Sequence, residues 1–170
     1  ELFGIDTRSL ALFRICLSIL IIADLIINAT SLTAHYTDNG VIPRSEIMQN
    51  STRPWHLSIH FISGSLSVQI LLFFIAGIFA ILMLLGVYTR FATFMSWYFL
   101  TSMHIRNPYL LQNGDVLLRL LLFWSIFLPL GAAYSIDSLS RTSRKIPSQR
   151  ILSFGTAAVL MQAVFMYAFS

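Results

Sequence analysis

The segment from Asn113 to Gly131 constrains the fold more than any other part of the chain, because it combines a long apolar run with internal charge. It is hydrophobic enough to cross a bilayer, yet it carries Asp115 at its start and Arg119 one helical turn later. A charged side chain at the centre of a membrane helix costs about 3 kcal/mol on insertion scales. The segment therefore predicts a membrane helix whose polar side faces other protein groups.

Composition supports this interpretation. The 170 residues are 56% hydrophobic and 11% charged, whereas about 25% of the residues in a soluble domain are charged. Four of the eleven basic residues lie in loop 138–150, a pattern typical of a topology signal and not of a nucleic-acid-binding face. The single cysteine, Cys16, excludes an internal disulfide framework and a cysteine-based metal site.

Five apolar segments have lengths close to the roughly 20 residues that span hydrocarbon. They run over about 10–29, 66–87, 91–105, 116–133 and 151–169. Because the backbone must satisfy its own hydrogen bonds in lipid, each should be a helix, and Pro129 should kink the fourth. We therefore predict an all-α integral membrane protein with five transmembrane helices, in which residues 1–170 form a single bundle. The long loop 30–65 should carry a short interfacial helix that starts at Pro54.

The loops predict an orientation. Loops 88–90 and 138–150 are basic, whereas the charges of loop 30–65 cancel. The excess of basic residues on the cytoplasmic side of membrane proteins then places the N-terminus and loop 138–150 in the cytoplasm. Loops 30–65 and 106–115 and the C-terminus are expected outside.

The first apolar segment carries a polar stripe. Arg14, Ser18, Asp24 and Asn28 fall within about a third of the helix circumference, so the stripe should face other helices. Arg14 is close to the predicted inner surface and is expected to reach the lipid headgroups.

Asp24 and Arg119 should lie at similar depths on antiparallel helices. We therefore predict an intramembrane polar network of Arg14, Asp24, Asp115 and Arg119, with an ion pair between Asp24 and Arg119. Asp115 is an alternative partner for Arg119, one turn away on the same face. Asp115 could equally serve in the first turn of its helix, where the dipole favours negative charge. A structural role for the network and a role in substrate or proton handling both remain open.

The four histidines all fall on the predicted outer side. His56 and His60 are spaced i, i+4, so that one helix face could present both to a metal, although no acidic or cysteine ligand is close in sequence. The alternative is an interfacial helix with two amphipathic histidines, and no metal site is assigned. His104, at the end of the third segment, could be an axial ligand of a haem or a chlorophyll.

Five motifs follow one another in order along the chain, at residues 5–14, 35–44, 106–119, 128–131 and 134–137. They include Ile5-Asp6, His35-Tyr36, Arg106-Asn107-Pro108-Tyr109 and Leu128-Pro129-Leu130-Gly131. In order and spacing they resemble the horizontally transferred transmembrane (HTTM) domain, a family that includes the membrane part of vitamin K-dependent γ-carboxylase. The resemblance covers nearly the whole chain and implies a membrane helical bundle.

The resemblance does not imply carboxylase activity. In the carboxylase, a lysine just after the helix that corresponds to the fifth segment acts as the base, and this chain ends at Ser170, about where that lysine would follow. The carboxylase histidine that precedes its fourth helix corresponds to Asn107 here, and the lumenal substrate domain has no counterpart. Many bacterial members resemble the carboxylase only in this bundle, so we expect a bacterial inner membrane as the location.

The favoured function is therefore that of a non-catalytic accessory or scaffold subunit in a larger respiratory or photosynthetic membrane complex. Such a subunit would pack against lipids, quinone-like molecules, pigments or partner helices, with ligand contacts at His56, His60, His104 and Asn107. One alternative is a fragment of a carboxylase-like, quinone-dependent enzyme whose catalytic half lies beyond residue 170. Another is a small transporter, which the sequence supports less because no inverted repeat or broken helix pair is visible.

Overall fold

The structure is a computed structural model that describes residues 5–41, 43–50, 58–140, 150–151 and 154–168. Its longer helices are α1 (Thr7–Thr30), α4 (Leu66–Leu85), α5 (Thr89–Arg106), α6 (Asn113–Ser125) and α8 (Phe154–Ala168). The shorter elements are α2 (Leu32–Tyr36), α3 (Arg44–Asn50) and α7 (Ile136–Ser140), with the 3-10 turns η1 (Ile59–Phe61) and η2 (Pro108–Leu110). Strand β1 (Ile5–Asp6) pairs antiparallel with β2 (Arg150–Ile151). Apart from this two-residue pairing, the predicted all-helical architecture is confirmed.

Each of the five predicted spans corresponds to one of the longer helices. Among the described helices, α1 and α4 are long and apolar enough to cross a membrane, with mean hydropathies of 2.6 and 2.8 in their most apolar windows. α6 and α8, with 13 and 15 residues, are shorter than the usual span of about 20. α5 has 18 residues but carries polar side chains along its length. Five membrane-spanning helices are therefore not confirmed.

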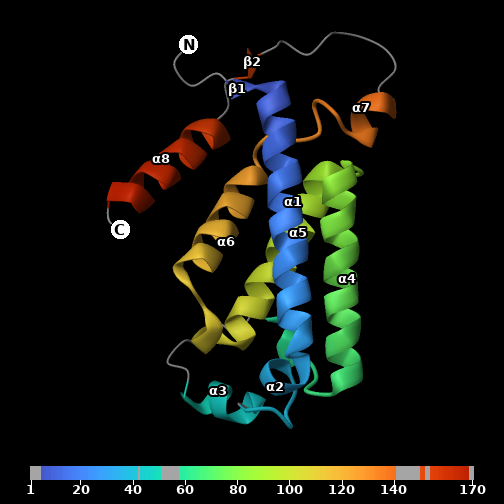
Figure 1. The fold of residues 1–170 in the computed structure, drawn as a ribbon, viewed down its shortest axis with the longest axis vertical. Helices are drawn as coiled ribbons and strands as arrows, with labels where there is room; N and C mark the ends of the chain where they lie inside the picture. Colours follow the sequence, from blue (N-terminus) through green and yellow to red (C-terminus); the bar gives the residue numbers. More distant parts are fainter. Residues whose placement is uncertain (1–4, 42, 51–57, 141–149, 152–153, 169–170) are drawn as a thin grey trace.

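The longer helices pack against one another in sequence order, and in Figure 1 α1 lies in front of α5, with α4 on one side and α6 and α8 on the other. α4 packs between α1 and α5, α6 packs against α5, and α8 packs against α6. One end of the bundle carries α7 and the β1–β2 pair, and we call it the α7 end. The opposite end carries α2, α3, η1 and η2, and we call it the α2 end.

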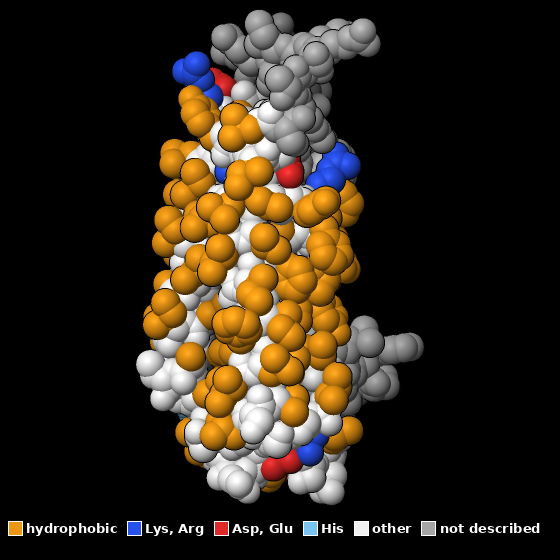
Figure 2. Space-filling model, turned by 90° about the vertical axis from the view of Figure 1, so that its right-hand side faces the viewer, with side chains coloured by type: hydrophobic (Ala, Val, Ile, Leu, Met, Phe, Trp, Pro, Cys, Tyr) orange, Lys and Arg blue, Asp and Glu red, His pale blue; other side chains and the backbone are white. Residues whose placement is uncertain are grey.

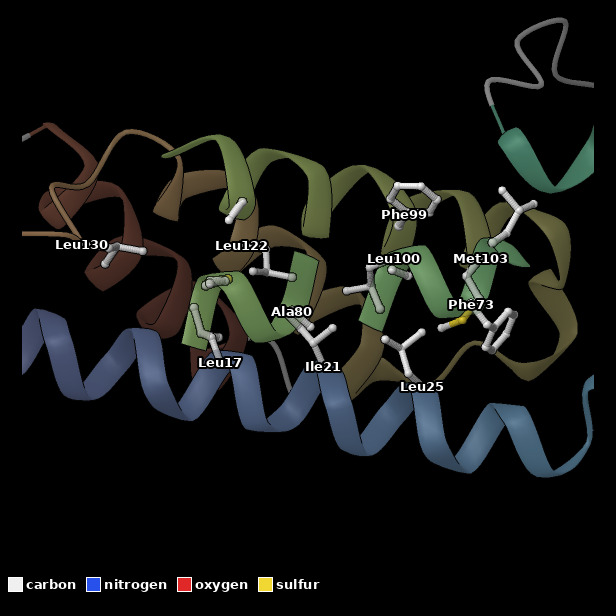
Figure 3. Close-up of a cluster of buried hydrophobic side chains, with 14 of the residues drawn as sticks. Leu17, Ile21, Leu25, Phe73, Ala80, Phe99, Leu100, Met103, Leu122 and Leu130 are labelled. Atoms are coloured by element: carbon white, nitrogen blue, oxygen red, sulfur yellow. The ribbon is translucent and has the colours of Figure 1, made fainter. Parts of the chain in front are cut away.

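Apolar side chains from α1, α4, α5 and α6 fill the centre of the bundle (Figure 3). Leu17 and Ile21 of α1 face Ala80 of α4, and each of these three side chains is at most 2% exposed. Small side chains allow neighbouring helix backbones to approach closely. Ala76 and Ala80 lie one helical turn apart on α4, and both are buried where α4 packs against its neighbours.

The outside of the bundle is also apolar. Large hydrophobic side chains are more than half exposed on α1 and α4, including Leu12, Ile26 and Ile27 on the first helix and Ile70, Leu71 and Phe74 on the second. Figure 2 shows hydrophobic side chains over the middle of one face, with charged side chains near both ends. Continuous apolar surface of this kind is normally covered by lipid or by another protein.

α6 ends earlier than the sequence predicts. The fourth span was expected to continue through a kink at Pro129, but α6 stops at Ser125 and the next three amides bond to carbonyls three residues back. Pro129 has no N–H to donate, and a proline disfavours helical backbone in the residue before it. The chain therefore leaves the helix before Pro129, and residues 126–135 form turns.

Within the described residues, loop 30–65 contains the short helices α2 and α3 but not the expected surface helix. Pro54 and His56 lie outside the described residues, and the part of the predicted helix that is described is the single 3-10 turn η1. A hydrogen bond joins η1 to α5, because the Ser58 hydroxyl donates to the Ser102 carbonyl at 2.6 Å.

At the exposed side of loop 30–65, Arg44 and Asp38 form an ion pair at 2.7 Å. These hydrogen bonds hold the Asp38 carboxylate in its charged form and lower its pKa.

Candidate functional site

A polar cavity of about 390 Å³ lies at the α2 end, between α1 and the segment that joins α5 to α6. Four of the residues predicted from sequence to be functional line it together: Asp24, His104, Asn107 and Asp115. The remaining lining residues are Ile27, Asn28, Ser31, His35, Tyr36, Leu111 and Gln112. We call this the α2-end cavity, and it is the candidate functional site.

The α1 side of the cavity is a chain of hydrogen bonds that starts at Asp24. The Asn28 amide, one turn further along the helix, donates to Asp24 Oδ1 at 2.9 Å. Asn28 Oδ1 in turn accepts from the Tyr36 hydroxyl at 3.2 Å. Asp24 Oδ2 is buried and has no hydrogen bond to another residue that the structure describes. One carboxylate oxygen is therefore hydrogen-bonded, whereas the other is buried without a partner among the described residues.

The opposite side is formed where α5 ends. His104 lies in the last turn of α5 and is 6% exposed, and Asn107, 5% exposed, caps the helix. Pro108 follows and begins η2, which directs the chain away from the α5 axis. His104 Nδ1 and Asn107 Oδ1 are buried without a hydrogen bond to any other described residue. Buried polar atoms in native structures are usually paired, so a water molecule or a ligand would complete the hydrogen bonds of these two.

Asp115 has a defined structural task. Its carboxylate accepts from the Gln112 backbone N–H at 2.9 Å, and together they form a capping box at the start of α6. The sequence alternative, in which Asp115 serves the first turn of its helix, is therefore confirmed.

No ion pair joins Arg119 to Asp24 or to Asp115 among the described residues, so the predicted pairing is wrong. Asp24 Oδ1 accepts from Asn28 of its own helix instead, and Asp115 Oδ2 accepts from the Gln112 N–H.

Arg14 belongs to the other end of the molecule. It is 1% exposed and does not reach outward, because Nη2 donates to the Tyr134 carbonyl at 2.6 Å and Nη1 to the Leu130 carbonyl at 3.4 Å. The expectation that it reaches lipid headgroups is therefore wrong. The four-residue network predicted from sequence separates into Arg14 at the α7 end, two carboxylates at the α2 end, and Arg119, which is half-buried on α6.

Asp137 is a structurally important residue that the sequence reasoning did not single out. Its carboxylate accepts from the backbone N–H groups of Tyr88 and Thr89 at 3.0 and 2.9 Å, and from the Thr89 hydroxyl at 2.8 Å. It thereby caps the start of α5 from a segment 48 residues away in sequence. A second cavity, of about 600 Å³, opens beside it and is bordered by Arg90 and Pro129. Because the Asp137 carboxylate is fully engaged in capping, this cavity is a weaker candidate site.

His60 does not line the α2-end cavity. It is 2% exposed and forms a 2.6 Å hydrogen bond through Nδ1 with Oε1 of Gln69, while its ring lies against Tyr36 and Phe73. Burial lowers the pKa of His60 below its ordinary value of 6.5. The alternative that places His60 in an amphipathic surface position is therefore wrong. No group of three or more histidine, cysteine or acidic residues suited to a metal occurs among the described residues.

Two members of the cavity, His35 and Tyr36, were missed as site residues, although both lie in the sequence motif at residues 35–44. Comparison with known proteins adds no relative: no protein-family model, curated protein or solved structure matches the chain. With Asp24, His104 and Asn107, the cavity chiefly offers hydrogen-bond acceptors.

Proposed function

We propose that the chain is an integral membrane bundle of HTTM type that acts as a non-catalytic accessory or scaffold subunit of a larger respiratory or photosynthetic membrane complex. The observation that carries the proposal is the apolar exterior of α1 and α4. Ile27 is 68% exposed and Phe74 is 67% exposed, and both lie in helices long enough to span a bilayer. Lipid tails and partner helices are the environments that suit such a surface.

The polar side chains inside the bundle support a non-catalytic role. Arg14 and Asp137 hold backbone groups at the α7 end, and Gln69 bonds to the carbonyls of His60 and Ser63 at 3.1 and 2.6 Å. Groups used in this way stabilise turns and helix ends, where the backbone lacks partners of its own. This use of polar groups suits a scaffold.

We further propose a bacterial inner membrane as the location, with the α2 end outside and the N-terminus and loop 138–150 in the cytoplasm. Among the described residues, the exposed Arg8 and Arg90 lie at the α7 end, whereas the α2 end carries Arg44, which pairs with Asp38, and the buried Arg106. A larger number of exposed basic residues favours the cytoplasmic side of a membrane. The charge distribution of the described residues therefore agrees with this orientation.

Native purification tests the subunit role. The tagged chain is solubilised from its own membranes in a mild detergent, and the mass and composition of the particle are measured. We expect a particle heavier than the 19.2 kDa chain that contains other transmembrane proteins in fixed ratio. A monomer with no stoichiometric partner would contradict the proposal.

Surface variants make this test specific. Ile27→Ser and Phe74→Ser alter the exteriors of α1 and α4, and Val41→Ser is a matched control at a site that is 73% exposed outside these helices. At least one of the two helix variants should lower the partner ratio while the control leaves it unchanged. If all three variants retain partners equally, these faces do not mediate the association.

A fragment of a carboxylase-like, quinone-dependent enzyme remains the second candidate. The observation that favours it is the position of Asn107, which lies in the α2-end cavity and corresponds in the HTTM resemblance to a carboxylase histidine. Organic extraction of the purified chain, followed by mass analysis, tests this candidate. Stoichiometric quinone would favour the enzyme fragment, and its absence would leave the subunit as the better proposal.

A further inference from the structure

We infer that the α2-end cavity binds a small organic ammonium group, the protonated primary amine of either a free small molecule or a lipid headgroup. The inference rests on the cavity alone and holds whether or not the chain is a subunit of a complex. The groups that carry it are Asp24, His104 and Asn107, which meet at this cavity from α1 and from the end of α5.

The hydrogen-bonding pattern of the cavity matches a donor ligand. Asp24 Oδ2 and Asn107 Oδ1 are pure acceptors, and His104 Nδ1 accepts when the ring proton is on Nε2. All three atoms are buried, and none has a hydrogen-bond partner among the described residues. A primary ammonium group has three N–H donors and no acceptor, so it complements these three atoms.

The charge of the cavity selects a cation. Asp24 and Asp115 both line it, and no lysine or arginine is among the described residues that do. The capping box uses one oxygen of Asp115 for the Gln112 N–H, whereas Asp24 keeps an oxygen free in the interior. Burying a lone carboxylate is costly, and an ammonium partner that binds there reduces that cost.

The size and walls of the cavity limit the ligand. A volume of about 390 Å³ lies at the lower end of the range for ligand pockets, which is about 300–1,000 Å³. Ile27 and Leu111 give one part of the wall an apolar surface, and the Tyr36 ring also contributes. A short alkyl chain attached to the ammonium group fits these walls.

Calorimetric titration of the purified full-length chain in maltoside micelles tests the inference with two probes. Butylammonium chloride carries three N–H donors, and tetramethylammonium chloride has the same charge but no donor. We expect saturable binding of butylammonium and binding of tetramethylammonium that is at least about fivefold weaker, because the hydrogen bonds are lost. Equal binding of the two probes, or no saturable binding of butylammonium, would overturn the inference.

Matched variants identify the site. Asp24→Asn removes the charge with little change of shape and should weaken butylammonium binding at least about tenfold. Glu46→Gln removes the same charge from the exposed surface of α3 and should change it by less than about twofold. Asn107→Asp adds a carboxylate at the cavity and should tighten binding, which a merely structural role does not predict. If Asp24→Asn and Glu46→Gln behave alike, or if Asn107→Asp weakens binding, the assignment is wrong.

Reconstitution in nanodiscs distinguishes the two sources of the amine. In discs of phosphatidylcholine, whose headgroup lacks N–H donors, butylammonium should bind as it does in micelles. If the natural ligand is a lipid amine, discs that contain phosphatidylethanolamine should block the probe, and if it is a free molecule they should not. Either result supports the ammonium site, whereas no binding in phosphatidylcholine discs would refute it.

Discussion

Arg14→Met removes the buried cation that holds the α7 end together. The Arg14 guanidinium joins α1 to the turns after α6, because it donates to the carbonyls of Tyr134 and Leu130 at 2.6 and 3.4 Å. Tyr134 has a positive φ of 49°, so this segment cannot continue as a helix and use these carbonyls itself. Methionine keeps the apolar stem but leaves both carbonyls without this donor.

The expected loss can be worked from the two contacts. The shorter bond is charge-assisted and contributes about 1.5–3 kcal/mol, and the 3.4 Å contact contributes about 0.5 kcal/mol. Methionine is cheaper to bury than a guanidinium, which offsets part of this sum. We therefore expect the free energy of unfolding to fall by about 2 kcal/mol.

Reversible unfolding in mixed detergent micelles, followed by tryptophan fluorescence and far-ultraviolet circular dichroism, measures this loss. Arg90→Met is the matched control, since Arg90 is exposed at the same end of the bundle, and it should change the free energy by less than about 0.5 kcal/mol. If Arg14→Met is as stable as the parent protein, the guanidinium does not hold these turns and the reasoning fails.

The same unfolding assay checks three further predictions. Burial lowers the pKa of His60, so the unfolded chain binds a proton at higher pH than the folded chain. The free energy of unfolding should therefore fall as the pH drops below 6.5. The variant His60→Asn should lose this part of the pH dependence. An unchanged pH dependence in that variant would contradict the claim that His60 causes it. Gly64→Ala places a Cβ against the Asp38 carboxylate and displaces Asp38 from Arg44, which should lower the free energy of unfolding by about 1–2 kcal/mol. Its control, Gly77→Ala, has open space around the new Cβ and should be neutral or stabilising. Equal effects of the two glycine substitutions would contradict this steric account. Asp115→Ala breaks the capping box and should cost about 1 kcal/mol, against little change for the exposed Asn113→Ala, and equal losses would argue against the cap.

The positions of the long helices could be predicted from the sequence because apolar runs and their lengths determine them locally. The end of α6 could not, because the decisive groups are distant: Pro129 terminates the helix, and Arg14 then satisfies carbonyls of the turns that follow. The prediction was that Pro129 would kink the helix without ending it. In the structure the guanidinium of another helix bonds the freed backbone instead.

The members of the candidate site were predicted in two separate sets, Asp24 and Asp115 in the intramembrane network and His104 and Asn107 as outer-side ligand contacts, and their common location was not predicted. Asp24, His104, Asn107 and Asp115 do line one cavity, since the polar stripe of α1 faces the segment between α5 and α6. The predicted ion pair with Arg119 does not form among the described residues. For Asp24 the partner is Asn28, one helical turn away in the same helix, a pairing that the sequence already contained.

Cysteine labelling in sealed membrane vesicles tests most directly the claim that this bundle spans a membrane with its α2-end cavity outside. In a Cys16→Ser background, Val41→Cys reports the α2 end and Leu139→Cys the α7 end, at sites that are 73% and 77% exposed. In right-side-out vesicles, an impermeant maleimide should label position 41 at once and position 139 only after the vesicles are opened. Equal labelling of both positions in sealed vesicles, or labelling of position 139 alone, would contradict the account.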